Sequence, residues 1–329
     1  MPEPTPLPIR ILATAQALPR RVVTTDELAP QLGLSAEVAL KRTGVAERRW
    51  VSDGETALSL GAQAAREAVA QAGLELEQID TLLNASGSQL QPIPDGAALL
   101  ARELGLRGAA TYSLHGTCLS FLLALNHAAL LIASGQARHV LIISSEAGSL
   151  GLNRGQPEST LLIGDGAAAV VVGPATKPAQ GIAAVRIETY PEGADSTQIR
   201  GGGSLLHPKD CVPEDLTFDM QGLKVLKLAS EVVPDFLERL QTGLSRSLVG
   251  IDRVIPHQAS QAGLNLMTRY GWPAERIEVT LPTLGNVIAA SLPLTLHQAL
   301  KGGRAKAGDT LLLVGTGAGL IAGGLILHL

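Results

Sequence analysis

Three polar side chains in apolar surroundings could do chemistry together: a thiol at Cys118, an imidazole at His257 and a carboxamide at Asn286. Cys118 follows the small-residue turn Gly116-Thr117 and precedes an almost uncharged run at 119–133, which predicts a helix buried on nearly every side. A cysteine in the first turn of a helix faces the positive end of the macrodipole, where thiolate is favoured. The pattern indicates a nucleophile, although free cysteine usually acts as a small buried hydrophobe.

The other two residues have simpler explanations when each is taken alone. His257 follows a short apolar strand within Pro256-His257-Gln258, where a histidine is more often structural than catalytic. Asn286 follows Gly285 at the start of an apolar run, where it could serve only as a helix N-cap. These explanations weaken when the positions of the three residues are compared between the two halves of the chain.

The two halves repeat one pattern. Ile79-Asp80 and Ile251-Asp252 each begin a strand, Cys118 follows Asp80 by 38 residues, and Asn286 follows Asp252 by 34. Each of these residues opens an apolar helix behind a glycine, and each helix leads into a further strand. The period is far longer than that of solenoid repeats, so we expect a duplicated α/β domain. Strands that alternate with helices predict mainly parallel sheets covered by helices.

The turn-rich segment 173–181 separates the halves, so the expected domains are residues 1–174 and 175–329. If the halves pack about a pseudo-twofold axis, the helix starts at Cys118 and Asn286 point toward one central cavity. His257 lies just after the strand that matches 79–85 and can reach the same cavity. A thiol, an imidazole and a carboxamide that converge in this way form a nucleophile with polar partners.

Composition excludes several classes of partner. The 329 residues are 46% hydrophobic and only 2% aromatic, so the core must be aliphatic. The formal net charge of −4 gives no electrostatic basis for binding nucleic acid or an anionic membrane. Cys118 and Cys211 lack metal-ligand spacing and predict no metal site, while a single disulfide between them stays open. No signal-peptide pattern is evident, so a cytoplasmic protein is expected.

The uncharged segment 310–327 is about as long as a membrane span, but it contains five glycines. We expect two short buried strands around a glycine turn rather than a tail anchor. Gly315, Gly317 and Gly319 also resemble a dinucleotide motif, but that motif needs a following helix and a βαβ unit. Only ten residues follow Gly319, so the dinucleotide interpretation is rejected.

Periodicity, caps and breakers predict the remaining elements. Strands are expected at 9–17, 79–85, 111–114, 139–148, 182–189, 254–255 and 277–280, with two strands hinged at 164–166 inside 161–173. Helices are expected at 56–72, 97–104, 220–240, 261–270 and 286–300, with a kink or break at Pro234. The basic segment 41–50 is expected to be a loop, either solvated or in contact with an anion. Residues 1–8 are expected to be extended or disordered.

The motifs around these residues resemble those of a known family. The chain is similar, over nearly its whole length, to thiolase-fold condensing enzymes of the β-ketoacyl-acyl-carrier-protein synthase III type. The matching segments are Lys41-Arg42-Thr43-Gly44-Val45 with Glu47-Arg48-Arg49, Gly164-Asp165-Gly166-Ala167, Phe218-Asp219-Met220-Gln221-Gly222, Val254-Ile255-Pro256-His257-Gln258-Ala259, Gly285-Asn286 with Ala289-Ala290-Ser291, and Gly317-Ala318-Gly319-Leu320. Together these motifs are specific, whereas none of them would be specific alone.

The resemblance implies a five-layer αβαβα thiolase-like fold and assigns roles to individual residues. Cys118 would accept the acyl group, while His257 and Asn286 would serve the condensation half-reaction by stabilising an enolate. The backbone amides of Cys118 and Ala318 would form an oxyanion hole. The substrate-binding residues carried over are Arg42, Met220, Gly222 and Ala259. The implied partners are an acyl-CoA and a malonyl thioester, with acyl carrier protein as one carrier, and no cofactor besides the coenzyme A or phosphopantetheine thioester itself.

The chain departs from the family pattern mainly at the surface that receives the carrier. Val38 stands where the family often has a tryptophan that stacks on adenine, and Ala262 where an arginine often helps to dock acyl carrier protein. Ser260 replaces the usual asparagine, and His115-Gly116-Thr117 replaces small residues before the cysteine. We therefore expect an intact catalytic centre with weakened carrier recognition, in which Arg42, Arg48 and Arg49 remain as phosphate contacts.

The leading functional prediction is a decarboxylative Claisen condensation that gives a β-ketoacyl thioester through acyl-Cys118. One alternative is a specialised relative that condenses without decarboxylation or transfers the acyl group to a hydroxyl or amine. A second alternative, from another class, is an inactive partner subunit that contributes only an interface. The resemblance also implies a homodimer with the loop 90–96 at its interface.

Overall fold

The computed structural model describes residues 6–329 and contains two main β-sheets. The order of strands in the first sheet is β1 (Ile9–Ala17), β7 (Gly166–Pro174), β6 (Val140–Glu146), β4 (Thr81–Asn84) and β5 (Ala110–Ser113). In the second sheet it is β11 (Arg253–Pro256), β12 (Thr310–Gly317), β13 (Ile321–His328) and β8 (Gly181–Thr189). Two small hairpin-like pairs complete the strands, β2 (Arg21–Thr24) with β3 (Glu47–Trp50) and β9 (Thr197–Gln198) with β10 (Asp219–Met220).

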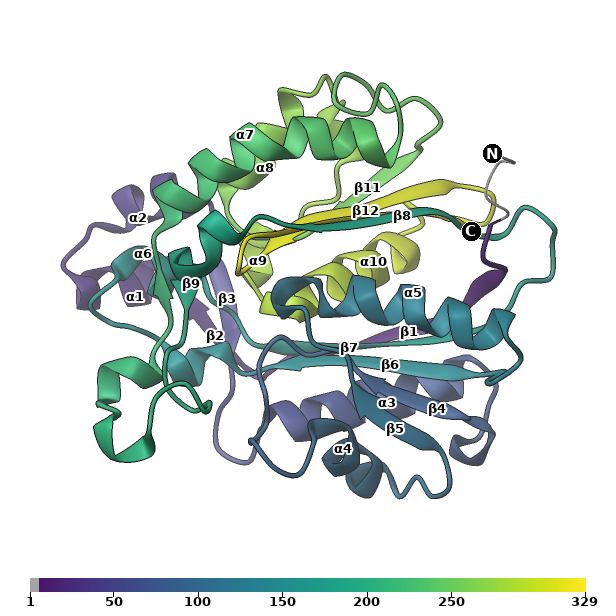
Figure 1. Cartoon of the computed structure of the whole chain (residues 1–329). Coiled ribbons are helices and arrows are strands. Elements are labelled where there is room, and N and C mark those ends of the chain that lie inside the picture. Colours follow the sequence, from purple (N-terminus) through teal and green to yellow (C-terminus); the bar gives the residue numbers. More distant parts are fainter. Residues whose placement is uncertain (1–5) are drawn as a thin grey trace.

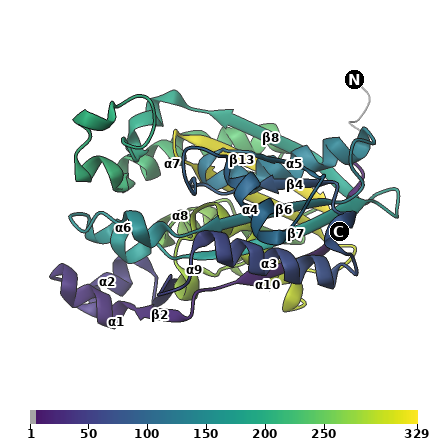
Figure 2. The same cartoon turned by 90° about the horizontal axis from the view of Figure 1, so that it is seen from below.

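Helices cover both faces of each sheet, so the fold has five layers (Figure 1). Helices α5 (Ser120–Ala133) and α10 (Ser291–Lys301) lie between the sheets, and α3 (Ala57–Gln71) and α4 (Gly96–Leu104) pack on the outer side of the first sheet. Helices α7 (Gly222–Leu240) and α8 (Gln261–Thr268) form the outer layer above the second sheet. Short helices α1 (Thr25–Leu28), α2 (Ala36–Thr43) and α6 (Pro157–Leu162) lie at one end, and α9 (Leu281–Leu284) packs on β3. Figure 2 shows the same arrangement from below. The predicted αβαβα thiolase-like fold is confirmed.

The amphipathicity of each helix matches its layer. The central helix α5 contacts β6 and β7 of one sheet and β8 and β13 of the other, and its sequence SFLLALNHAALLIA contains no charge. A helix covered on both sides must be apolar nearly all round, as the sequence predicted. The outer helix α3 instead buries one alanine-rich face, and Thr56 caps its start in a capping box with Ser59.

The sheets are mixed rather than mainly parallel. Ladders β4–β5, β4–β6 and β11–β12 are parallel, whereas β1–β7, β6–β7, β12–β13 and β8–β13 are antiparallel. Strands β12 and β13 are joined by only the short turn 318–320, and such a connection can link antiparallel strands only. The segment 310–327 is therefore the predicted strand pair. Among residues 6–329 no helix is both long and apolar enough to cross a membrane.

Several element predictions were wrong in detail. The expected loop 41–50 contains the end of α2 and all of β3, and the expected first strand of 161–173 is the end of α6. Segment 277–280 forms only an isolated bridge to β11, and α7 continues through Pro234. Of the expected extended or disordered segment 1–8, residues 1–5 lie outside the described part of the chain, and Leu7 pairs with Ile182. The domain division at 174/175 stays a prediction; it falls between β7 and β8.

Candidate active site

Cys118 lies in a 3₁₀ turn, Thr117–Leu119, directly before α5. Thr117 has a positive φ of 51°, and the turn is closed by the hydroxyl of Ser120, which accepts from the Gly116 amide at 3.0 Å and donates to the Thr117 carbonyl at 2.7 Å. A positive φ in a β-branched residue is strained, so the turn is held by its surroundings. Cys118 is consequently two positions ahead of Ser120, the first residue of the α-helix that the sequence predicted it would open.

The surroundings of the thiol oppose its ionisation in the resting protein. Burial, followed by the negative charge of Glu146, raises the pKa of Cys118 to about 12. Hydrogen bonds from the backbone amides of Ala318 and of Cys118 itself act in the opposite direction. The expectation that the helix start alone would favour thiolate is therefore wrong, because desolvation outweighs the amides. The resting thiol is therefore protonated at neutral pH.

The turn between β12 and β13 lies against the cysteine turn. A Cβ at Gly317 would approach the Thr117 hydroxyl to 2.5 Å, and one at Gly315 would approach the Cβ of His257 to 2.5 Å. Only glycine at both positions allows the backbone to pass this closely. This close passage is what brings the Ala318 amide to the thiol.

His257 follows β11 directly, and its amide donates to the carbonyl of Val314 on the neighbouring strand at 2.8 Å. The residue is 4% exposed, and burial lowers the pKa of its imidazole to about 4. Its Nδ1 has no hydrogen-bond partner within the described part of the chain. At neutral pH, His257 is thus an uncharged imidazole that is a weak base but keeps one N–H to donate.

Asn286 follows Gly285 and precedes α10 by several residues, so it does not open that helix as predicted. Its Oδ1 accepts from the Ile288 amide at 2.9 Å, and its Nδ2 donates to the Ala259 carbonyl at 3.2 Å. The second N–H of the carboxamide remains for a ligand, because a primary amide carries two donors. Asn286 and the loop after His257 therefore hold each other in place.

Two other family-motif residues support this arrangement. The buried carboxamide of Gln258 makes four hydrogen bonds, donating to Pro256 and Glu278 and accepting from Thr280 and Leu281. These contacts tie the His257 loop to the segment that leads to Asn286. Gly164 donates its amide to the Asn286 carbonyl at 3.0 Å, and a Cβ on Gly164 would approach the Leu284 carbonyl oxygen to 2.0 Å.

The structure corrects the register of the duplication. The amide of Val287 donates to the hydroxyl of Ser291 at 3.0 Å, as Gly116 does to Ser120, and Ile288 has a positive φ of 45° like Thr117. A second 3₁₀ turn, Ile288–Ala290, thus matches the cysteine turn. The counterpart of Cys118 is therefore Ala289 rather than Asn286. The two residues still converge, but they do not occupy equivalent positions.

Glu146 is a buried group at the site that the sequence-based reasoning missed. It ends β6 with 0% exposure, and its carboxylate accepts from the amide and hydroxyl of Ser88, the amide of Gly87 and the amide of Ala289. Burial raises the pKa of Glu146 to about 7, against the effect of these donors. A single glutamate at the end of the otherwise uncharged run VLIISSE was the available signal.

One cavity of about 350 Å³ joins the predicted catalytic residues Cys118, His257 and Asn286. The other predicted site residues, Ala318, Arg42, Met220, Gly222 and Ala259, also line this cavity. Ala262, at the expected carrier-docking position, lines it as well. Arg42 is an exposed side chain whose guanidinium lies 3.8 Å from the Glu158 carboxylate. The nucleophile and the proposed donor contacts therefore share one continuous space.

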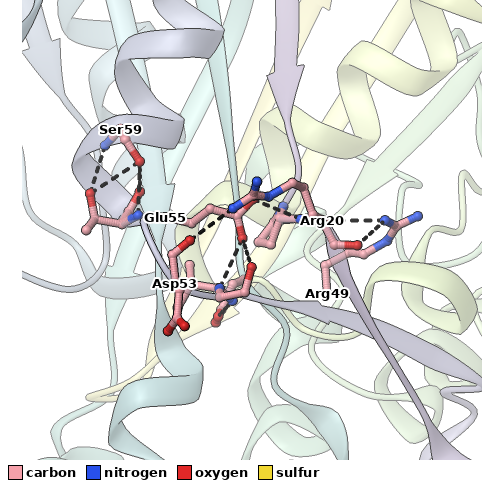
Figure 3. Close-up of polar contacts among 10 residues, drawn as sticks. Arg20, Arg49, Asp53, Glu55 and Ser59 are labelled. Atoms are coloured by element: carbon pink, nitrogen blue, oxygen red, sulfur yellow. Dashed lines mark hydrogen bonds and ion pairs between the residues drawn. The ribbon is translucent and has the colours of Figure 1, made fainter.

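The other two expected phosphate contacts are wrong. Arg48 is completely buried, and its guanidinium donates to the carbonyls of Val23 and Leu161 and to the Thr25 hydroxyl. Burial lowers the pKa of Arg48 to about 10. Arg49 donates to the carbonyls of Pro19 and Arg20 and belongs to a separate polar cluster (Figure 3). Both guanidinium groups satisfy backbone carbonyls, so neither faces the cavity.

The second cysteine lies away from the site. Cys211 and Cys118 are both free thiols, and Cys211 is not among the residues that line the cavity. The disulfide that the sequence left open is thus not formed. The weak hydrogen bond from the Cys211 thiol to the Val212 carbonyl, at 3.7 Å, places Cys211 in a loop of local contacts.

Comparisons with known proteins agree with this geometry. A family model described as 3-oxoacyl-[acyl-carrier-protein (ACP)] synthase III matches residues 112–191, and one described as the C terminal of that synthase matches residues 245–329. A beta-ketoacyl-[acyl-carrier-protein] synthase III from Methylococcus capsulatus is 33% identical over 324 residues, covering 97% of this chain and 98% of the relative.

Solved structures give the same result. The 3-oxoacyl-[acyl-carrier-protein] synthase III from Aquifex aeolicus superposes with a TM-score of 0.87 at 28% identity, covering 98% of this chain and 100% of that one. The priming beta-ketosynthase from the R1128 polyketide biosynthetic pathway has a TM-score of 0.87 at 27% identity, covering 99% of this chain and 98% of that one. Both similarities extend over nearly the whole chain and therefore include both sheets.

Proposed function

Because the chain belongs to the 3-oxoacyl-[acyl-carrier-protein] synthase III family, we propose that it joins an acyl thioester to a malonyl thioester by decarboxylative Claisen condensation. The product is a β-ketoacyl thioester, and the acyl group is carried on Cys118. The observation that supports this function is the convergence of Cys118, His257 and Asn286 on one cavity, with the Ala318 amide at the thiol. The reaction requires no cofactor beyond the thioester substrates, and the proposal keeps the predicted cytoplasmic location.

In the loading half-reaction the sulfur of Cys118 attacks the thioester carbonyl. The carbonyl oxygen becomes an oxyanion that the amides of Cys118 and Ala318 stabilise, since fixed donors in a dry site act strongly on developing charge. The carbon–sulfur bond of the donor then breaks, and the departing thiol takes the proton that Cys118 gives up. Because the proton passes from Cys118 to the departing thiol, this step needs no separate side chain as a base. Such a transfer suits a thiol whose pKa is raised by burial.

In the condensation half-reaction the malonyl thioester loses carbon dioxide and leaves an enolate. The N–H of neutral His257 and the free N–H of Asn286 stabilise its oxygen. The enolate carbon attacks the acyl carbonyl on Cys118, a carbon–carbon bond forms, and the Cys118 thiolate leaves and takes up a proton from solvent. The lowered pKa of His257 supports a role as a hydrogen-bond donor rather than a base.

Val38 and Ala262, which stand where the family often has carrier contacts, support a second candidate within the same chemistry, a priming condensation in a specialised pathway. Val38 is a 40% exposed aliphatic residue that cannot stack on adenine as an indole can, and Ala262 offers no charge to an acidic carrier. Arg42 is the remaining cation of the three expected phosphate contacts. Reaction with a malonyl donor on coenzyme A alone, but not on acyl carrier protein, would favour this second candidate.

Mass spectrometry after incubation with acyl-CoA tests the proposed intermediate. We expect one acyl group on the intact protein, located on Cys118, and none in Cys118→Ala. Cys211→Ala is the matched control and should load like the parent protein. Acyl label on Cys211, or label retained by Cys118→Ala, contradicts the assignment, and no acyl mass with any donor would indicate a subunit that contributes only an interface.

We also propose a homodimer that uses the β5 edge of the first sheet. β5 is the last strand of that sheet, and its backbone is paired on one side only, with β4. In the adjacent loop, Ile93 leaves 85% of its surface exposed. An unpaired strand edge next to an exposed aliphatic side chain favours association of a second copy.

A further inference from the structure

The cavity that contains Cys118 continues along the inner face of α7. Residues Leu226, Ala229, Val233, Phe236 and Leu237 line it from this helix, with Leu266 of α8 on the other side. Successive residues of this set on α7 are three or four positions apart, except for the adjacent pair Phe236 and Leu237, so their side chains form one stripe along the helix. From Leu226 to Leu237 the stripe is about 16 Å long at the rise of an α-helix.

Among residues 6–329, no charged residue lines this arm of the cavity. The two charged residues that line the cavity, Arg42 and Glu158, lie 3.8 Å apart on α2 and α6, away from the α7 stripe. Leu226, Val233 and Leu266 line the arm and are only half-buried, so part of their apolar surface is left uncovered. Apolar surface left open inside a protein is stabilised by an apolar ligand that removes it from water.

Aromatic side chains lie at the end of the arm remote from the charged pair. Tyr270 and Trp272 line this end and contact each other edge to face, with ring centroids 5.5 Å apart. The Tyr270 hydroxyl has no hydrogen-bond partner within the described part of the chain, and burial raises its pKa to about 12. The indole N–H of Trp272 is occupied by the Leu244 carbonyl at 2.8 Å. Apart from the Tyr270 hydroxyl, the residues at this end of the arm offer a ligand hydrophobic contact.

We propose that this arm, between α7 and α8, receives the aliphatic tail of the acyl group carried on Cys118, and that the protein prefers unbranched medium- or long-chain acyl donors to acetyl donors. The inference rests on the proposed function, since the chain must be attached to the thiol. A pantetheine arm does not suit the same space, because its amides would lose hydrogen bonds among these aliphatic side chains. The part of the cavity with Arg42 and Glu158 is suited to the polar carrier, and the apolar arm is suited to the aliphatic tail of the acyl group.

The test is the rate of Cys118 acylation by a series of acyl-CoA donors from acetyl to hexadecanoyl, measured on the full chain by intact mass. Loading efficiency is expected to rise with length by up to about fourfold for each added methylene, the equivalent of ~0.8 kcal/mol per buried methylene. The rise should stop at the length that fills the arm. A flat or falling profile from acetyl upward overturns the proposal.

Val233→Phe narrows the arm from α7, and the readout is the ratio of dodecanoyl to butanoyl loading. We expect this ratio to fall at least tenfold. Val232→Phe is the matched control, because Val232 is a neighbour on the same helix that does not line the cavity. An unchanged ratio in Val233→Phe overturns the proposal, as does an equal loss in the control.

Trp272 allows a second measurement that does not depend on a narrowed variant. An 11-bromoundecanoyl group loaded on Cys118 should quench the fluorescence of Trp272 relative to the unbrominated chain, and Trp272→Phe should remove the difference. Equal fluorescence with both chains overturns the placement of the tail. Absence of loading with every donor would instead overturn the proposed function and this inference with it, whereas a preference for acetyl overturns this inference alone.

Discussion

At the scale of single residues, burial decides which groups around the nucleophile are charged. It raises the pKa of Cys118 to about 12 and of Glu146 to about 7, and it lowers the pKa of His257 to about 4. Near neutral pH the site therefore contains a thiol, an uncharged imidazole and a carboxyl group close to its midpoint. Chemistry in this site depends on donated hydrogen bonds rather than on resident charges.

His257→Ala and Asn286→Ala are expected to separate the two half-reactions. Each variant should load acyl groups onto Cys118 at a rate within about threefold of the parent protein, because loading uses the amides of Cys118 and Ala318. Product formation with a malonyl donor should fall about 10²- to 10³-fold, the usual effect of removing one donor to a developing oxyanion. Single-turnover loading and steady-state condensation measure the two steps. Equal losses in both steps for His257→Ala would make His257 the base for the thiol.

Glu146→Gln is expected to change the reactivity of Cys118 in a pH-dependent way. Below about pH 7 the carboxyl of Glu146 is mostly protonated, so the parent and the variant should be alkylated by iodoacetamide at similar rates. Above that pH the carboxylate of the parent raises the pKa of the thiol, so the variant should react at least about threefold faster at pH 8.5.

Asp165→Asn is the control for this titration. Asp165 is another buried carboxyl whose pKa is raised by burial, but its carboxylate accepts from the amides of Ser149 and Val51. The alkylation profile of Asp165→Asn should follow that of the parent. A difference between Glu146→Gln and the parent that is the same at pH 6 and pH 8.5 would show that Glu146 acts only on the shape of the turn.

The sequence predicted which residues line the cavity, but it did not predict which charged residues are buried near it. Cys118, His257 and Asn286 stand in local motifs that can be read directly. The burial of Arg48 and Glu146 could not be predicted from the sequence, because their hydrogen-bond partners are distant in the chain. Arg48 reaches Leu161 across 113 positions, and Glu146 accepts from Ser88 across 58. A charged side chain is predictable as buried only when those partners are known.

At the scale of elements, glycine contacts hold the site together. Gly164→Ala should destabilise the fold by about 2–4 kcal/mol, because its Cβ would lie 2.0 Å from the Leu284 carbonyl oxygen and the backbone must shift. Since Gly164 also donates to the Asn286 carbonyl, condensation should fall more than loading. Urea unfolding and the two half-reaction assays measure these effects.

Gly151→Ala is the matched control for this substitution. Its Cβ would meet only the Leu216 carbonyl oxygen at an ordinary 3.8 Å. We expect its stability to lie within about 1 kcal/mol of the parent. A Gly164→Ala protein that is as stable as Gly151→Ala would show that the segment from Leu284 to Asn286 can shift without loss of stability.

Long, strongly patterned elements were predictable, and short ones whose form depends on tertiary pairing were not. Strand Ile9–Ala17 was predicted with the observed bounds, and α3 and α4 within one or two residues. β3 was missed because its basic sequence ERRW pairs with β2 and buries Arg48 and Trp50, which no local pattern reveals. The start of α10 was misplaced because a 3₁₀ turn, not a helix, follows Asn286.

At the scale of the whole molecule, the free edge of the first sheet predicts the oligomeric state. Sedimentation should show a dimer at micromolar concentration, and Ile93→Glu should shift it toward monomer by placing a charge at the apolar contact. Leu205→Glu is the control, because Leu205 is 96% exposed in the separate loop between β9 and β10. A parent protein that sediments only as monomer contradicts the proposed interface.

The close passage of the β12–β13 turn over the cysteine turn also has a consequence for the timing of biosynthesis. Ala318 follows Cys118 by 200 positions, and the chain is synthesised from its N-terminus at about 5–20 residues per second, so roughly 10–40 s separate the two residues at the ribosome. Until Gly315 and Gly317 settle against His257 and Thr117, the thiol has no amide from Ala318 and the cavity lacks one wall. A nascent chain therefore carries its nucleophile long before it can use it, and the capacity to accept an acyl group appears only once the second sheet has closed.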